Sequence, residues 1–341
     1  MPDHLTLPLA VALGSAALFA FTNGLQDAAL STAALIATRA ARPAHAMAFA
    51  AVFTLVGPLL VGAAVATTMG GVVIVPADRA APVLGAGLSA ATAWNLFTWR
   101  LHLPSSAGHA LIGGLVGSAL ADAGSGAVTW GPIVGGRLAG VLGVLLGLLL
   151  GVGLGTATGW AIQTALLRLL RRASSSVGAS VRRVQWFTSA ALAATVGAND
   201  AQKTAGIASA LLVAGGASPG GTGLAPILAS SVALLAGMLL GGWSLSRTLG
   251  RHLFPLRSLD GLASQTASTA VLLAASLAGA PVSPSQVTAT SIVGVGLARH
   301  RWHHVSWGIV RRIAVAWVTT PLAAGIIAVV LLPLWRLLPG G

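Results

Sequence analysis

The sequence of 341 residues contains no cysteine and no glutamate, so its only acidic groups are six aspartates. The absence of cysteine excludes disulfides and thiolate metal sites, and it gives no indication of the redox compartment. Charged residues make up only 7% of the chain and apolar residues 55%, with a mean hydropathy of +0.87. A chain so poor in charge cannot present a polar surface to water on all sides. We therefore expect an integral membrane protein whose partner is the lipid bilayer, with no separate soluble domain.

Apolar runs recur along the whole length. A hydrocarbon core of ~30 Å needs roughly 20 helical residues. The N-terminus carries Asp3 and His4 in place of a basic region, so Leu5 onward is expected to begin a first spanning helix and not a removed signal. The expected crossings are 7–37, 44–66, 81–99, 104–121, 132–165, 186–213, 225–245, 260–279, 282–298 and 306–335.

The net charge of +13 comes from arginines that lie mostly between apolar segments, where they determine topology and do not indicate a nucleic-acid partner. Placing most of them in the cytoplasm leaves only Arg79, Arg137 and Arg336 outside. The cytoplasmic set comprises Arg39, Arg42, Arg100, Arg168, Arg171, Arg172, Arg182, Arg183, Arg247, Arg251, Arg257, Arg299, Arg301, Arg311 and Arg312.

This distribution predicts an all-α protein of two inverted repeats. Residues 1–165 form the first transmembrane repeat, 166–185 a basic cytoplasmic linker, and 186–341 the second repeat. Five segments in each half, an odd number, make the second half enter the membrane from the opposite side. Both termini are then outside, and the protein is a multi-pass protein of the cell membrane. Secondary transporters show such repeats, with broken or re-entrant helices meeting near the midplane.

Two aspartates occupy matching apolar places in the two halves. Gly24-Leu25-Gln26-Asp27-Ala28 is repeated as Gly197-Ala198-Asn199-Asp200-Ala201, with Asp200 lying 173 residues after Asp27. An ionisable group in hydrocarbon is expensive and normally faces a cavity lined by protein. Asp27 and Asp200 are therefore expected to mark an ion or substrate path. The other aspartates, Asp3, Asp78, Asp122 and Asp260, are expected in solvated loops or at the termini.

A second repeated motif strengthens this prediction. The segment from Pro104 to Gly114, with Ser105 and Ser106, matches the segment from Pro281 to Ser291, with Ser283 and Ser285, at an offset of 177 residues. Proline followed by serine is a good helix start. Two such starts converging at the midplane would direct two positive dipole ends and several hydroxyls at one place, which is an anion site. A multivalent anion beside two carboxylates needs a compensating cation, so symport is expected.

Lys203 and His109 each have a functional and a structural interpretation, and a set of glycines has a structural one. Lys203, the only lysine, lies one turn after Asp200; it is either a ligand for a phosphate-like anion or a moving charge, or it simply neutralises Asp200, the interpretation that paired membrane charges favour. His109 is a candidate proton relay or the donor of an interhelical hydrogen bond. Glycines indicate close helix packing: Gly113, Gly114, Gly117 and Gly294.

At these motifs the chain resembles the PiT inorganic phosphate transporter family. The resemblance runs through residues 23–27, 94–99, 104–117, 197–203, 242–243 with 247–250, 281–291 and 316–319. It implies a homodimeric symporter that imports inorganic phosphate with Na⁺ or H⁺ and needs no other cofactor. Five positions depart from the family pattern: Gln26 stands for Asn or His, Leu30 for Asn, and Pro284-Ser285-Gln286 for Thr-Thr-His.

The resemblance also assigns site residues. The aspartates and their neighbouring amides are expected to hold cations, with Na⁺ at Asp27, Asn199 and Asp200. The cation set comprises Asn23, Gln26, Asp27, Asn199 and Asp200, and the phosphate set comprises Asp27, Ser105, Ser106, Asp200, Lys203, Ser283, Ser285 and Thr290.

Two alternatives stay open at this point. A sulfate symporter of the same family is disfavoured because sulfate has no proton at neutral pH to donate to the two carboxylates. An anion channel or an anion-binding receptor would show no dependence on a cation gradient. An enzyme is not expected, because no nucleophile, base and orienting group occur at usable spacing.

Overall fold

The computed structural model describes residues 6–101, 103, 105–131, 133–134, 137–138, 140–172, 177–218, 223–241, 256–299 and 305–339. This part of the chain is almost entirely helical, as expected, apart from the two-residue antiparallel strands β1 and β2, in which Ile133 pairs with Leu138. Pro104, Arg247, Arg251, Arg301 and the motif at 242–250 lie outside the described residues. The elements are α1 (Leu7–Ala37), α2 (Pro43–Val61), α3 (Ala64–Gly70), α4 (Ala77–Arg100), α5 (Ala107–Ala123), η1 (Gly124–Ala127), β1 (Ile133–Val134), β2 (Arg137–Leu138), α6 (Gly140–Leu169), α7 (Val177–Ala214), α8 (Ala225–Gly241), α10 (Ser258–Leu277), α11 (Pro284–Ala298) and α12 (Trp307–Arg336).

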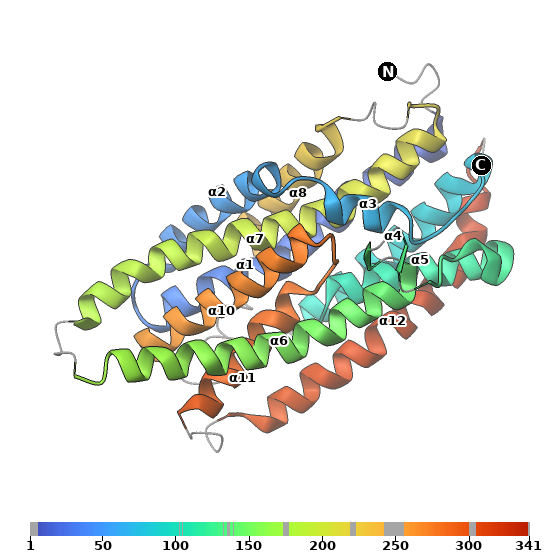
Figure 1. Ribbon diagram of the computed structural model, residues 1–341. Coiled ribbons are helices and arrows are strands. Elements are labelled where there is room, and N and C mark those ends of the chain that lie inside the picture. The colour runs from blue at the N-terminus through green and yellow to red at the C-terminus, as the bar shows by residue number, and fades with distance from the viewer. Residues whose placement is uncertain are drawn as a thin grey trace.

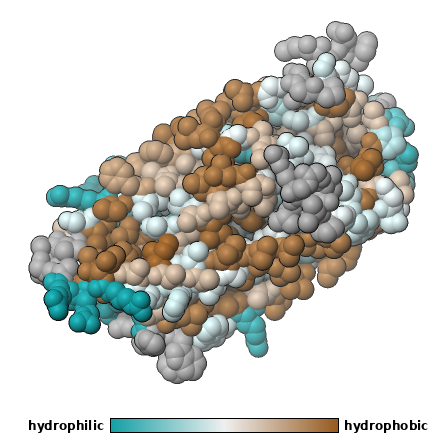
Figure 2. Space-filling model, in the orientation of Figure 1, coloured by the Kyte–Doolittle hydropathy of each residue, from teal (hydrophilic) through white to brown (hydrophobic). Residues whose placement is uncertain are grey.

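The helices lie side by side in an elongated bundle (Figure 1). The start of α1 and the end of α12 lie at one end of it, and the end of α6 and the start of α7 lie at the other. Brown, apolar atoms cover much of the visible length, while teal, polar atoms gather mainly at the two ends (Figure 2). Leu149, Leu240 and Ile326 are more than 60% exposed, which fits a surface in contact with lipid. This is a multi-pass membrane protein.

The two halves pack by the same rules. Helix α1 packs on α8 as α7 packs on α2, and α5 packs on α12 as α11 packs on α6. If α1, α2, α5 and α6 are matched with α7, α8, α11 and α12, the helix pairs of one half correspond to those of the other. The bundle therefore consists of two inverted repeats. The first turns of α7 run through the expected linker 166–185, whose boundaries, like those of the repeats, stay predictions.

Four of the ten expected crossings, 81–99, 104–121, 260–279 and 282–298, correspond to helices that pair as hairpins and do not each cross the whole bundle. Helices α4 and α5 form one hairpin, and α10 and α11 form another. The open ends of the two hairpins lie toward opposite ends of the bundle (Figure 1), and their tips meet where Ser106 Oγ donates to Ser283 Oγ across 3.0 Å. Helix α5, with its extension to Ala127, is long and apolar enough to span a bilayer; its contacts show instead that it is one arm of a re-entrant hairpin. Each half keeps an odd number of crossings, so the inversion is unaffected.

Ion pairs close the open end of each hairpin. Asp122 on α5 pairs with Arg79 on α4 at 3.1 Å and with Arg336 at the end of α12. In the other hairpin the polarity is reversed, because the aspartate is Asp260 at the start of α10 and the cation is Arg299 after α11. The two aspartate side chains are 1% exposed. The expectation that both aspartates are solvated was therefore wrong. Asp122 lies at the end of α5 and Asp260 at the start of α10, and the arginine partners of both could not be identified from local sequence.

Glycines set the distance between the helices that carry the two candidate aspartates. A side chain at Gly24 of α1 would collide with the backbone of Leu234 in α8, and one at Gly197 of α7 would collide with the backbone of Thr54 in α2. The G-x-amide-D motif thus places its aspartate one turn beyond a close helix crossing. The close packing expected at Gly113, Gly114, Gly117 and Gly294 is also confirmed, since each faces the backbone of a neighbouring helix.

We expect Gly197→Val to destabilise the fold by about 3 kcal/mol or more, because a backbone cannot move aside as a flexible side chain can. The melting temperature and the monodisperse fraction in detergent measure this. Gly14→Val in α1 is the matched control, because nothing lies within 4 Å of the position where its Cβ would be. Equal stability of the two variants would contradict the close crossing.

Candidate functional site

The two hairpin tips present helix N-termini to each other. Ser106 caps α5 by accepting from the backbone N–H of His109 at 3.3 Å, and Ser283 caps α11 by accepting from that of Gln286 at 3.4 Å. Ser285 Oγ lies 2.9 Å from Ser283 Oγ and donates to the carbonyl of Ser105. The positive ends of two helix dipoles and a cluster of hydroxyls therefore converge at one buried place.

The two aspartates meet beside these tips. The Asp27 carboxyl on α1 lies near the Asp200 carboxyl and the Lys203 ammonium on α7. Lys203 Nζ is 2.7 Å from Asp200 Oδ1 and donates to the carbonyl of Val282, the residue before Ser283, at 2.5 Å. Asp27, Asp200 and Lys203 are 5%, 3% and 2% exposed. The acidic pair, the lysine and the second tip thus form one continuous polar cluster.

The amides that precede the aspartates hold the first arms of the hairpins at equivalent points. Gln26 donates to the Asn95 carbonyl at 3.0 Å and to Thr98 Oγ1 at 3.3 Å in α4. Asn199 donates to Ser276 Oγ at 3.1 Å in α10. Thr98 and Ser276 were not predicted from the sequence; their spacing of 178 residues, close to that of the two motifs, was the available signal.

The first tip is tied to the same network. Ser105 Oγ lies 2.8 Å from Thr98 Oγ1 and donates to Gln26 Oε1 at 3.3 Å. The polar atoms of Gln26 are therefore engaged in fixing α1 to the hairpin α4–α5. Asn23 is also buried, at 2% exposure, one turn before Asp27.

Several buried acceptors of the cluster have no partner among the described residues: Asp27 Oδ2, Asp200 Oδ2 and Asn199 Oδ1. Leaving a buried polar group unpaired costs about 1–3 kcal/mol, and more when the group is charged. Carboxylate and amide oxygens are ligands that hard cations accept. Each residue expected to hold Na⁺ thus offers an oxygen without a hydrogen-bond partner among the described residues.

Two predicted residues stand apart from this geometry. Thr290 Oγ1 bonds back to the carbonyls of Gln286 and Val287 and faces Gly155 of α6, so the structure does not bring it to the tip. Thr290 lies six residues after Pro284, beyond the first turn of α11, and its role in phosphate binding stays a prediction. His109 is 8% exposed, and its Nδ1 has no partner in the described part of the chain. Its role as a proton relay stays a prediction.

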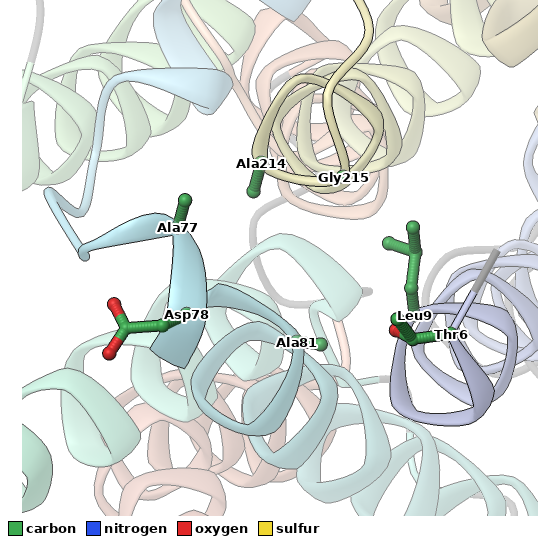
Figure 3. Close-up of a pocket in the computed structure, with 7 residues that line it drawn as sticks. All are labelled: Thr6, Leu9, Ala77, Asp78, Ala81, Ala214 and Gly215. Carbon is green, nitrogen blue, oxygen red and sulfur yellow. The ribbon is translucent and has the colours of Figure 1, made fainter. Parts of the chain in front are cut away.

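Two cavities among the described residues are not lined by the charged groups of the cluster. One cavity of about 880 Å³ lies between α3, α7 and α8 and includes Gly70, Ser209 and Ile227. Another, of about 270 Å³, is shown in Figure 3, where Leu9, Ala81 and Ala214 face the space and the Asp78 carboxylate points away from it. Neither of these two cavities is lined by Asp27 or Asp200, whose side chains are buried among the described helices.

Comparisons with known proteins give a consistent picture. A model of the phosphate transporter family matches residues 23–180 and again 171–328, once in each half. A probable low-affinity inorganic phosphate transporter of Rhizobium meliloti is 36% identical over 339 residues, covering 96% of this chain and 97% of the relative. A protein of the same description from Bacillus subtilis is 33% identical and covers 90% and 91%.

The fold has a solved counterpart. A structure described as the sodium-dependent phosphate transporter superposes with a TM-score of 0.86, covering 97% of this chain and all of that one at 20% identity. The match supports the arrangement of the helices. Together with the double family match and the similarity over nearly the whole chain, it confirms the resemblance inferred from the two repeated motifs: this chain belongs to the phosphate transporter family.

Proposed function

We propose that this protein is a secondary active transporter that imports inorganic phosphate by symport with Na⁺ or H⁺ through alternating access. The observation that supports this most strongly is the buried cluster in which two serine-capped helix N-termini lie beside two carboxyl groups. Helix N-termini and hydroxyls favour an anion. Carboxylates favour a cation and accept the proton of a phosphate hydroxyl. Relatives named as inorganic phosphate transporters support the same substrate.

Alternating access is supported by the inverted hairpins. Each reaches the cluster from a different end of the bundle, and each open end has its own ion pair, Arg79–Asp122 in one and Asp260–Arg299 in the other. Rocking one repeat against the other would open one side at a time. In this proposal both termini are outside, the 166–185 linker is cytoplasmic, and the protein acts as a homodimer in the cell membrane.

Proteoliposomes test the transport function. Vesicles loaded with unlabelled phosphate should transiently accumulate external labelled phosphate, and unlabelled sulfate should compete weakly, because sulfate leaves the carboxylates without a proton to accept. A pore would equilibrate the label without accumulating it. Stronger inhibition by sulfate than by phosphate would support the sulfate alternative.

A further inference from the structure

The ammonium group of Lys203 occupies a position that has the oxygen ligands of a cation. It contacts a carboxylate oxygen of Asp200 at 2.7 Å and the carbonyl oxygen of Val282 at 2.5 Å, and it lies near the Asp27 carboxyl. The first turn of α5 is also close, since a Cβ at Gly108 would lie 3.7 Å from Nζ. Carboxylate and backbone carbonyl oxygens are also the ligands that transporters use for Na⁺.

This position is shared by both repeats. Lys203 and Asp200 belong to α7, Val282 to the tip of the second hairpin, and Asp27 to α1 of the first repeat. A buried ammonium has three N–H donors that need acceptors. Here the ammonium also binds the carbonyl next to Ser283, the N-cap of α11. A positive charge is thereby fixed at the point where the hydroxyls of the two tips would receive an anion.

We infer that Lys203 is a tethered cation which replaces one coupling Na⁺ in the binding of phosphate. The inference rests on the proposed function and concerns its specificity for the coupling ion. The ammonium offsets one of the two carboxylate charges in every turnover and is not transported. Because the chain itself carries the positioning charge, phosphate binding and uptake by the wild-type protein require no Na⁺, and H⁺ serves as the coupling ion.

Two variants separate a tethered cation from simple neutralisation. Lys203→Ala removes the charge and leaves room for an ion among the same oxygens, whereas Lys203→Met removes the charge but fills the room with apolar atoms. Phosphate uptake and the phosphate-induced rise in melting temperature are measured for both in choline, K⁺ and Na⁺ buffers. Ser118→Ala is the control, because Ser118 on α5 bonds only within its own helix.

In Na⁺-free buffer the wild-type protein and S118A should transport phosphate and be stabilised by it. Uptake by both Lys203 variants should be lower by about 30-fold or more, because one partner of a buried charge pair is missing. Na⁺ should restore K203A by about 10-fold or more, and it should restore neither K203M uptake nor its stabilisation by phosphate. K⁺, which is larger, should restore neither variant.

Three results would overturn the inference. If wild-type uptake stops without Na⁺, the inference is overturned but phosphate transport remains established. This measurement uses only the wild-type protein, so it does not depend on whether a variant folds. Equal behaviour of K203A and K203M in Na⁺ would reduce Lys203 to a neutralising role, as would unchanged uptake by either in choline. Absence of phosphate uptake by the wild-type protein under every gradient would instead contradict the proposed function.

Discussion

Asp200→Asn and Asp27→Asn are each expected to lower the initial rate of phosphate uptake by about 100-fold or more, because removing one member of a buried charged cluster costs about 3–5 kcal/mol. In D200N the Lys203 ammonium, now 2.7 Å from an uncharged side chain, loses its ionic partner. In D27N the cluster loses a carboxylate that has an oxygen without a partner. Labelled phosphate uptake into proteoliposomes measures both.

The control for these two variants is Asp78→Asn. Asp78 is exposed in the first turn of α4 and lies away from the cluster, so D78N should transport at the wild-type rate. Size-exclusion profiles in detergent show whether D27N and D200N are folded. Full uptake by folded D27N and D200N would remove the carboxylates from the mechanism.

Removing the hydroxyls at the two tips should have the second largest effect. We expect Ser106→Ala and Ser283→Ala each to raise the phosphate concentration for half-maximal uptake by about 10-fold, because a hydrogen bond to a charged group contributes about 1.5–3 kcal/mol. The double variant should fall short of the product of the two effects, since the hydroxyls bond each other at 3.0 Å and contacting residues are not additive. Concentration-dependent uptake provides the measurement.

Two buried hydroxyls on the same hairpin arms serve as controls. Ser118 on α5 and Thr290 on α11 both bond to carbonyls of their own helix. Ser118→Ala and Thr290→Val should leave the half-maximal concentration unchanged. An effect of T290V as large as that of S283A would restore Thr290 to the phosphate set and contradict the placement of the site at the helix N-caps.

Much of this architecture was predictable from local sequence. Apolar length gave most of the helices within a few residues, although α6 begins eight residues after and α7 nine residues before the expected start, and the crossing expected at 44–66 is divided between α2 and α3. The repeat of Gly24-x-x-Asp27 as Gly197-x-x-Asp200 identified the two aspartates of the cluster. These features are encoded in short segments. The inversion could be predicted because arginine placement obeys an electrostatic rule that depends only on the order of charges along the chain.

The hairpins and the lysine contact could not be predicted in the same way. A helix of 17 residues such as α5 has the composition of a crossing, and only its contacts reveal that it turns back. The partners of Asp122 and Asp260 lie up to 214 residues away in sequence, and the bond from Lys203 to Val282 spans 79 residues. Such contacts depend on packing between elements, which spacing along the chain does not specify.

The absence of cysteine from the whole chain permits the most direct measurement of the central claim, that phosphate binds where the two hairpin tips meet. Ser285→Cys places the only thiol at the second tip, at a residue that is partly exposed and bonded to Ser283 and Ser105. The rate at which a charged thiol reagent labels S285C should fall by about 10-fold when saturating phosphate occupies the site, because bound ligand excludes the reagent. A labelling rate that does not change at phosphate concentrations that saturate uptake would contradict the account.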